Sequence, residues 1–231
     1  MLFIKTLYKM VRLGIALLLA ITVAFLATFT HDVISLVHTP FAMPFDETTN
    51  TFRNFDRSVV CTPQRVIVVA CEADVVAAVK EASEANRTLR AVGAGHSFQP
   101  LACGDYMMNM DGLRRILFVN ASHGTVVVES GIRLKTLNEA LAGFGLAMPQ
   151  LGLITEQSLA GAISTGTHGT GFAHASVGAM AVQSADIIAG NGSLVTLTGR
   201  RLNISLVSLG AMGIVVRYTL KCVPAHRLHQ F

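Results

Sequence analysis

The chain has 231 residues, of which 52% are hydrophobic and 14% are charged, so it can bury the core of one large domain or two small ones. The formal net charge is +4, but the 18 basic residues are scattered and are not interleaved with aromatic side chains, which excludes a nucleic-acid partner. The eight histidines and four cysteines do not fall at metal-ligand spacing, so no metal site is expected.

A membrane-targeting pattern occupies the N-terminal part of the chain. The stretch 13–29 is apolar and uncharged, and three basic residues precede it. Its length lies at the lower end of the roughly 17 to 25 residues that span a bilayer and exceeds the apolar part of most cleaved signals. We therefore expect a basic flank over 1–12 and a transmembrane segment or retained signal anchor over 13–30. A cleaved signal and a buried helix are the alternatives.

The basic flank also predicts the orientation of this anchor. Basic residues stay on the cytoplasmic side, so we expect the rest of this single-pass chain in the lumen of an endomembrane compartment, the endoplasmic reticulum. In that topology the sequons at Asn86, Asn120, Asn191 and Asn203 become accessible to glycosylation. Asn191 is the least favoured of the four because a tight turn is expected around it.

A connector is expected over 31–53, followed by a patterned domain over 54–224. The domain opens with a strand, helix, strand unit. A β-branched run covers Arg65 to Ala70, apolar residues at helical spacing cover Glu72 to Asn86, and Leu89 to Val92 is apolar again. The crossover is long enough to make the two strands parallel. The glycine loop that follows is therefore expected beyond the carboxyl end of the second strand, where ligand sites are common.

After residue 115 the pattern changes to strands separated by turns. The expected strands are Ile116 to Val119, Thr125 to Glu129, Ala179 to Ile188, Ser193 to Thr198 and Gly213 to Lys221. Short helices are expected at Leu134 to Ala142 and at Asn203 to Leu209, and Asn191-Gly192 predicts a hairpin. The sequence thus predicts an α+β fold with a small parallel lobe and a larger, mainly antiparallel lobe.

The four cysteines have two possible interpretations. Cys61, Cys71, Cys103 and Cys222 contain no C-x-x-C pair, and small buried apolar residues are the favoured interpretation. Disulfides are the alternative if the domain is lumenal, and no pairing is assigned.

The loop from Gly93 to Phe98 places His96 inside a glycine turn. Phe98 stands where a dinucleotide fingerprint needs its third glycine, no Lys-Ser or Lys-Thr follows the last glycine, and Gln99 stands where a serine-hydrolase elbow needs a glycine. The loop therefore belongs to none of these classes. From the loop by itself, the favoured role of His96 is to cap the turn or to contact a pyrophosphate.

A second stretch rich in small residues runs from 148 to 171. No Lys or Arg occurs between Ala147 and Gly199, so an anion bound there would be held by backbone N–H groups, hydroxyls and a helix start. Gly161 to Gly166 has the spacing of an ATPase loop, but Thr167-His168 replaces its Lys-Ser. This favours a buried pyrophosphate over γ-phosphate chemistry. The alternative is a Gly/Ala-rich helix packed closely on a sheet.

Three segments together resemble one known family, the flavin-binding domain of the vanillyl-alcohol oxidase superfamily. They are Val92 to Phe98, Glu156 to Ser158 with Ala160 to Gly171, and Ser208 to Val215. Within that superfamily the chain is most similar to the aldonolactone oxidases, over about 54–224. The resemblance implies a two-lobed domain with FAD between the lobes, and FMN as the alternative cofactor.

The resemblance also implies which residues bind the flavin. They are Gly93, Ala94, Gly95, His96, Ser97 and Phe98 in the first loop, Ser158, Gly161, Ala162, Ser164, Thr165, Gly166, Thr167, His168 and Gly169 in the second, and Ile214 against the adenosine half. Relatives with this Gly-His-Ser arrangement often attach the flavin to the imidazole, so His96 is the candidate for covalent attachment. Relatives with a second link carry a Cys where this chain has Met148, so at most one link is expected.

For function, the resemblance implies an FAD-dependent oxidoreductase that oxidises a sugar-derived 1,4-lactone to an ascorbate-type product. The substrate domain of such enzymes, with their acid-base residues, follows the flavin domain, so 225–231 is expected to begin a truncated C-terminal part and no catalytic residue is assigned. We expect this portion to bind flavin without oxidising the lactone, its small-molecule partner, until that domain is present. The alternative is a membrane-tethered flavin-binding module without lactone oxidase activity.

Overall fold

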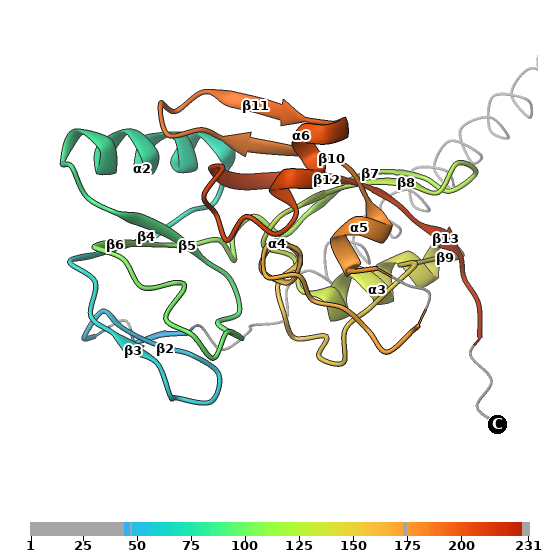
Figure 1. The fold of residues 1–231 in the computed structure, drawn as a ribbon, viewed down its shortest axis with the longest axis horizontal. Helices are drawn as coiled ribbons and strands as arrows, with labels where there is room; N and C mark the ends of the chain where they lie inside the picture. Colours follow the sequence, from blue (N-terminus) through green and yellow to red (C-terminus); the bar gives the residue numbers. More distant parts are fainter. Residues whose placement is uncertain (1–43, 47, 173–174, 228–231) are drawn as a thin grey trace, which may run out of the picture. The chain divides into compact units, whose positions relative to one another are not determined.

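A small parallel sheet and a larger antiparallel sheet organise the part of the chain that the computed structural model describes, residues 44–46, 48–172 and 175–227 (Figure 1). The α+β class predicted from the sequence is confirmed. Among these residues no helix has the length and apolar character needed to cross a bilayer. The predicted membrane segment 13–30 and its basic flank lie outside the described residues.

The small lobe is a parallel sheet of β4 (Arg65–Val68), β6 (Tyr106–Asn109) and β5 (Leu89–Val92), in that order. The helix α2 (Glu72–Glu84) connects β4 to β5. Both outer strands run parallel to β6, as the long crossover predicts, but they do not pair with each other. The sequence pattern did not predict β6, since its four residues lack the β-branched side chains and the alternation that mark a strand.

Local chemistry explains why α2 begins where it does. Cys71 is the N-cap, and the carboxylate of Asp74 accepts hydrogen bonds from the backbone N–H groups of Ala70 (2.8 Å) and Cys71 (3.0 Å). These bonds lower the pKa of Asp74. The helix then buries one face, formed by Val75, Ala78, Val79 and Ala82.

A small antiparallel sheet of β1 (Phe45–Asp46), β2 (Thr51–Arg53) and β3 (Val60–Cys61) stands beside the small lobe. The expected connector 31–53 therefore includes strands β1 and β2. Phe45 and Phe52 pack against Val92 of β5 and Met107 of β6 in the parallel sheet.

A disulfide joins β3 to the loop between β5 and β6, which corrects the favoured interpretation of the cysteines. Cys61 and Cys103 are paired, with their Cα atoms 5.9 Å apart. Cys71 and Cys222 form no disulfide with any described residue, and Cys222 is a buried apolar residue as expected, whereas Cys71 is exposed. Spacing could not predict the pair because 42 positions of sequence separate its members.

The larger lobe is an antiparallel sheet in the order β11-β10-β12-β8-β7. Its strands are β7 (Ile116–Asn120), β8 (Thr125–Glu129), β10 (Val182–Ile188), β11 (Leu194–Leu197) and β12 (Ile214–Lys221). The predicted hairpin at Asn191-Gly192 is confirmed, since β10 pairs with β11 around that turn. A short two-stranded pair, β9 (Leu146–Ala147) with β13 (Val223–Pro224), lies beside this sheet.

Helices α3 (Leu134–Gly143), α4 (Leu159–Ser164) and α5 (Val177–Ala181) share a core with this sheet, and α6 (Gly199–Ser205) follows β11. Two elements predicted from the sequence have different boundaries in the structure. The strand expected from Ala179 begins with the helical turn α5, because Ser176 caps it by accepting a hydrogen bond from the N–H of Ala179. The helix expected at 203–209 ends at Ser205.

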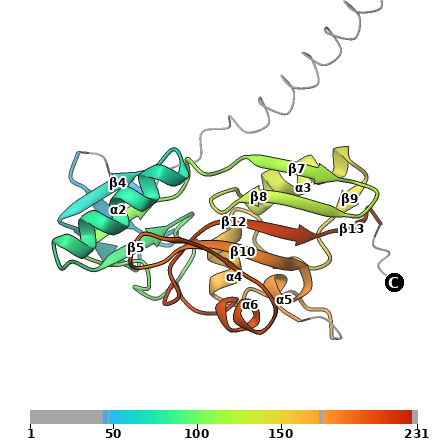
Figure 2. The same ribbon diagram turned by 90° about the horizontal axis from the view of Figure 1, so that it is seen from above.

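The two lobes share strand β12. Ile214 and Val216 near its start pack with α2 and β6, whereas Tyr218 and Leu220 further along pack with α3 to α5. Both views show the small sheet at one end of the domain and α3 with β7 and β8 at the other (Figure 2). An ion-pair network adds to this junction, since Arg217 of β12 contacts Asp186 of β10 and, at 2.8 Å, Glu72 of α2.

Candidate functional site

A pocket lies where the loop after β5 meets α4 and the beginning of β12. The predicted site residues that line it are Gly93, Ala94, Gly95, His96, Ser97, Ser158, Gly161, Ala162, Ser164, Thr165 and Ile214. Residues far apart in the sequence are thereby brought together, as the resemblance implied.

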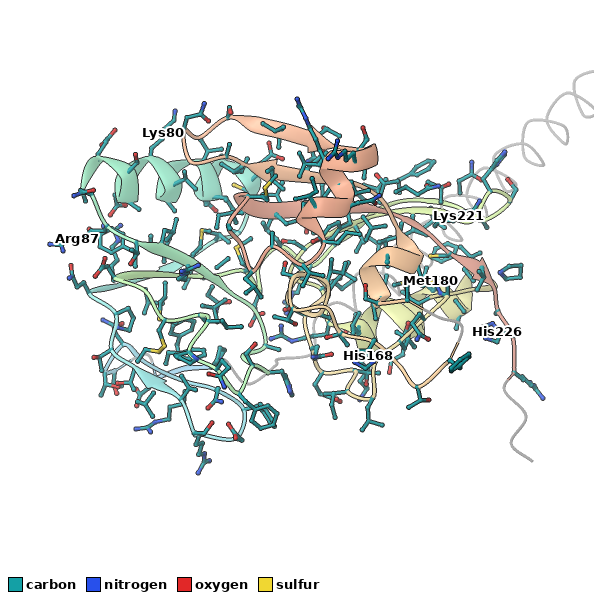
Figure 3. All side chains as sticks on the ribbon, viewed as in Figure 1. Lys80, Arg87, His168, Met180, Lys221 and His226 are labelled. Carbon is teal, nitrogen blue, oxygen red and sulfur yellow. A yellow bond between two sulfur atoms is a disulfide. The ribbon has the colours of Figure 1, made fainter. Side chains whose placement is uncertain are left out.

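Five predicted site residues do not line this pocket: Phe98, Gly166, Thr167, His168 and Gly169. Phe98 is 66% exposed. His168 is also exposed, in the loop that follows α4 (Figure 3), and its Nδ1 lies 3.0 Å from the carbonyl oxygen of Gly169. The pocket instead includes residues that were not predicted, among them Ser130, Gly131, Gln157, Leu209, Gly210 and Gly213. A glycine in the turn just beyond a strand, as at Gly131 two residues after the end of β8, was the available signal for part of this set.

The β2–β3 segment holds the glycine turn in place. The side-chain amide of Asn54 donates to the carbonyl oxygen of Ser97 (3.0 Å), and the backbone N–H of Phe55 donates to the carbonyl oxygen of Gly95 (3.0 Å). The ring of Phe55 stacks on the imidazole of His96 with a centroid distance of 4.7 Å. Nothing in the local sequence around His96 predicts these contacts, because their partners come from about forty residues earlier in the chain.

Two glycines of the turn are required for different reasons. Gly95 has φ +68°, a left-handed conformation that favours glycine. Gly93 permits close packing instead, since a β-carbon there would lie 1.9 Å from Oγ of Ser158. The first loop and the start of α4 are therefore in direct contact.

The start of α4 is held by the segment between β8 and α3. The N–H of Leu159 donates to the carbonyl oxygen of Ile132 (2.8 Å), and the N–H of Ala160 donates to that of Ser130 (3.0 Å). Leu159, Ala162 and Ile163 are buried in the core. The alternative of a closely packed Gly/Ala-rich helix thus describes one side of α4, while Ala160, Gly161 and Ser164 line the pocket.

The pocket offers hydrogen-bonding groups that the described residues do not use. The backbone N–H groups of Gly93 to Ser97 donate to no acceptor in the described parts of the chain. Oγ of Ser130 and Oε1 of Gln157 are buried, and neither has a hydrogen-bond partner among the same residues. Buried polar groups are normally satisfied, so the N–H groups of the turn and the hydroxyl of Ser130 fit a polar ligand that accepts hydrogen bonds, whereas Oε1 of Gln157 would accept one from a donor.

His96 is electrostatically biased towards its neutral form. Burial lowers the pKa of the imidazole, the positive charge of Arg133 lowers it further, and Glu156 opposes both effects. A neutral imidazole keeps a nitrogen lone pair, so His96 has the protonation state of a nucleophile near pH 7.

Arg133 is a buried cation that the sequence did not single out. It is 4% exposed, and its Nη1 lies 2.8 Å from Oδ1 of Asp111. Burial raises the pKa of Asp111 in spite of the opposing effect of Arg133. The expectation that an anion is held without a basic side chain was based on residues 147–199 only. Arg133, at the start of α3, lies outside that range, but its guanidinium lies close to Gly93 of the first loop.

Comparison with known proteins identifies the ligand. The sequence pattern of the FAD binding domain family matches residues 63–198, more than half of the chain. The chain belongs to this family. FAD is accordingly its cofactor, and the unused N–H groups of the turn and the buried hydroxyl of Ser130 fit the acceptor oxygens of its pyrophosphate.

Relatives of this FAD-binding domain occur in bacteria, fungi and animals. The chain is similar to the L-gulono-1,4-lactone dehydrogenase of Mycobacterium tuberculosis, with 36% identity over 178 residues that cover 77% of this chain and 42% of the relative. It is 36% identical to the D-arabinono-1,4-lactone oxidase of Eremothecium gossypii over 77% of this chain and 35% of the relative. It is 31% identical to the L-gulonolactone oxidase of Scyliorhinus torazame over 77% of this chain and 41% of the relative. The chain therefore spans less than half the length of these relatives.

Proposed function

We propose that the protein uses FAD to oxidise a CH–OH group of a sugar-derived 1,4-lactone. The observation that carries this proposal is the similarity of the domain to relatives that are named as lactone oxidases or dehydrogenases, in organisms as distant as a bacterium, a yeast-like fungus and a shark. An oxidation of this kind removes two electrons and two protons from the alcohol, and FAD supplies the acceptor for the electrons when it is bound.

In this proposal the described residues hold the cofactor. The pyrophosphate lies against the N–H groups of Gly93 to Ser97 and the neighbouring start of α4, and the adenosine half lies near Ile214. The imidazole of His96 would be the point of covalent attachment: a ring nitrogen would bond to the 8α carbon of the isoalloxazine, the protons of the broken C–H and N–H bonds would leave to solvent, and the flavin itself would take up the two electrons until its external acceptor reoxidises it. Phe55 restricts the ring of His96 by stacking on it, so the imidazole is presented in one orientation.

We expect anaerobic addition of L-gulono-1,4-lactone or D-arabinono-1,4-lactone to bleach the absorbance of the oxidised flavin in the flavin-loaded protein that includes the substrate domain of such enzymes, whereas residues 1–231 by themselves are expected to bind flavin without oxidising the lactone. The corresponding open-chain aldonic acids serve as matched controls, because they carry the same hydroxyls without the lactone ring. Stopped-flow absorbance measures the reduction, and readmitted oxygen tests whether oxygen is the acceptor. Flavin that dithionite reduces but no lactone does would contradict the proposed activity and favour a flavin-binding module.

We further propose that the segment 13–30 anchors the protein in an endomembrane and that the FAD domain lies in the lumen. The disulfide between Cys61 and Cys103 supports this topology, since disulfides persist in oxidising compartments and are rare in the cytosol. The sequon asparagine Asn86 also supports it, because it is exposed just beyond the end of α2.

In intact microsomes the FAD domain is expected to resist added protease until detergent is present. Treatment with an endoglycosidase is expected to shift the mass of the wild-type chain, and Asn86→Gln to remove part of that shift. Asn191→Gln is the matched control with no expected change, because Oδ1 of Asn191 is engaged by the N–H and hydroxyl of Ser193 within the tight β10–β11 turn. Digestion of the domain without detergent would show that the orientation is wrong.

A further inference from the structure

Arg133 lies at the junction of the two loops that build the pocket. It is the N-cap residue of α3, and its backbone forms an isolated antiparallel bridge with Ser158 at the start of α4. Its guanidinium reaches the other loop, since Nη1 would lie 3.9 Å from a β-carbon at Gly93. One side chain thus lies close to both cofactor-binding segments.

The charge of Arg133 is strongly shielded from solvent. The residue is 4% exposed, and a guanidinium stays protonated even when it is buried. Water and salt therefore screen its field much less than that of a surface cation. Arg90 also lines the pocket, but its side chain is exposed, so its effect on a bound anion is weaker.

Asp111 opposes this charge from the side of β6. Its Oδ1 lies 2.8 Å from Nη1 of Arg133, the same nitrogen that reaches towards Gly93. The carboxylate stabilises the cation within the fold and also weakens the field that the cation exerts on the turn. Removing the carboxylate and removing the cation should therefore change the binding of an anion in opposite directions.

We propose that Arg133 is a positioning residue of the FAD site, a buried cation behind the glycine turn that draws the pyrophosphate to the N–H groups of Gly93 to Ser97. It acts through the turn and does not line the pocket. Asp111 is its counter-ion and sets the strength of this attraction. The inference rests on the placement of the pyrophosphate in the proposed function.

The test compares FAD, which carries the pyrophosphate, with riboflavin, which carries no phosphate. It uses the whole chain in detergent with the background substitution His96→Ala, which keeps flavin binding reversible. In that background the charge-neutral double variant Asp111→Asn/Arg133→Met is expected to raise the Kd for FAD about tenfold and to leave the Kd for riboflavin within about twofold. The double substitution avoids an unpaired buried carboxylate, which by itself could prevent folding.

The variant Asp111→Asn removes the carboxylate and keeps the cation, so it should change the Kd for FAD in the opposite direction. It is expected to lower the Kd for FAD and to leave the Kd for riboflavin within about twofold, and an unchanged Kd for FAD would show that Asp111 does not set the strength of the attraction. Equal weakening of FAD and riboflavin in the double variant would show a structural role and overturn the inference, as would weaker FAD binding in Asp111→Asn. If the His96→Ala background protein binds FAD no more tightly than riboflavin, the placement of the pyrophosphate is overturned as well.

Discussion

Replacing His96 with alanine is expected to remove all flavin fluorescence from the denatured protein, whereas the acid-precipitated wild type retains it. The imidazole lies in the pocket, and burial and Arg133 lower its pKa so that it is neutral near pH 7. Phe55 holds the ring by stacking at 4.7 Å. Since Met148 stands where relatives with a second link carry a Cys, no other link is expected in the variant.

The control for this experiment is His123→Ala, since His123 is exposed in the turn between β7 and β8 and does not line the pocket. It is expected to keep the fluorescence of the wild type. Both variants are examined as the whole protein, loaded with FAD and separated on a denaturing gel. Fluorescence that is missing from the wild type or kept by His96→Ala would return His96 to the role of a turn-capping residue.

The lowered pKa of His96 gives this attachment a pH dependence. The ordinary pKa of histidine is about 6.5, and the folded protein shifts it downwards, so covalent attachment should continue below about pH 6.5. It should be lost as the pH falls through the folded-state pKa, because a protonated imidazole has no lone pair to donate. The same shift stabilises the fold above the unfolded pKa, and this contribution is lost as the pH falls. The rate of attachment to the apo-protein across this range measures the effect.

Gly93→Ala is expected to lower the free energy of unfolding by about 1–3 kcal/mol and to weaken FAD binding by at least about tenfold. The new methyl group would lie 1.9 Å from Oγ and 2.7 Å from Cβ of Ser158, so the two cofactor-binding loops must separate. The backbone of Gly93 is not left-handed, so the expected effect is steric. Urea denaturation and a flavin fluorescence titration measure the two changes.

Ser158→Gly in the Gly93→Ala background should restore much of the loss, because it removes both atoms that the methyl group would meet. Glycine in place of serine at the N-cap of α4 costs only a few tenths of a kcal/mol. Gly143→Ala is the matched control, since nothing lies within 4 Å of a β-carbon at that position. It should leave both measurements near the wild-type values. Strictly additive effects of the Gly93 and Ser158 substitutions would contradict the steric account.

The sequence by itself determined the elements and loops that depend on neighbours in the chain. The periodicity of α2, the parallel arrangement that its length imposes, the β10–β11 hairpin and the glycine turn with His96 could all be predicted. Each follows from side chains a few residues apart, through helical spacing, turn chemistry or the backbone freedom of glycine. Their chemistry was sufficient to predict a pyrophosphate site.

Only the tertiary structure decided which distant residues complete that site. Strand β6 lies between β4 and β5, Asn54 and Phe55 hold the His96 turn, and Arg133 is buried behind Gly93. The physical reason is that these contacts join residues from 17 to more than 40 positions apart, and packing within one shared core selects them. Local propensity carries no information on such pairs, whereas burial makes their geometry and their charge decisive.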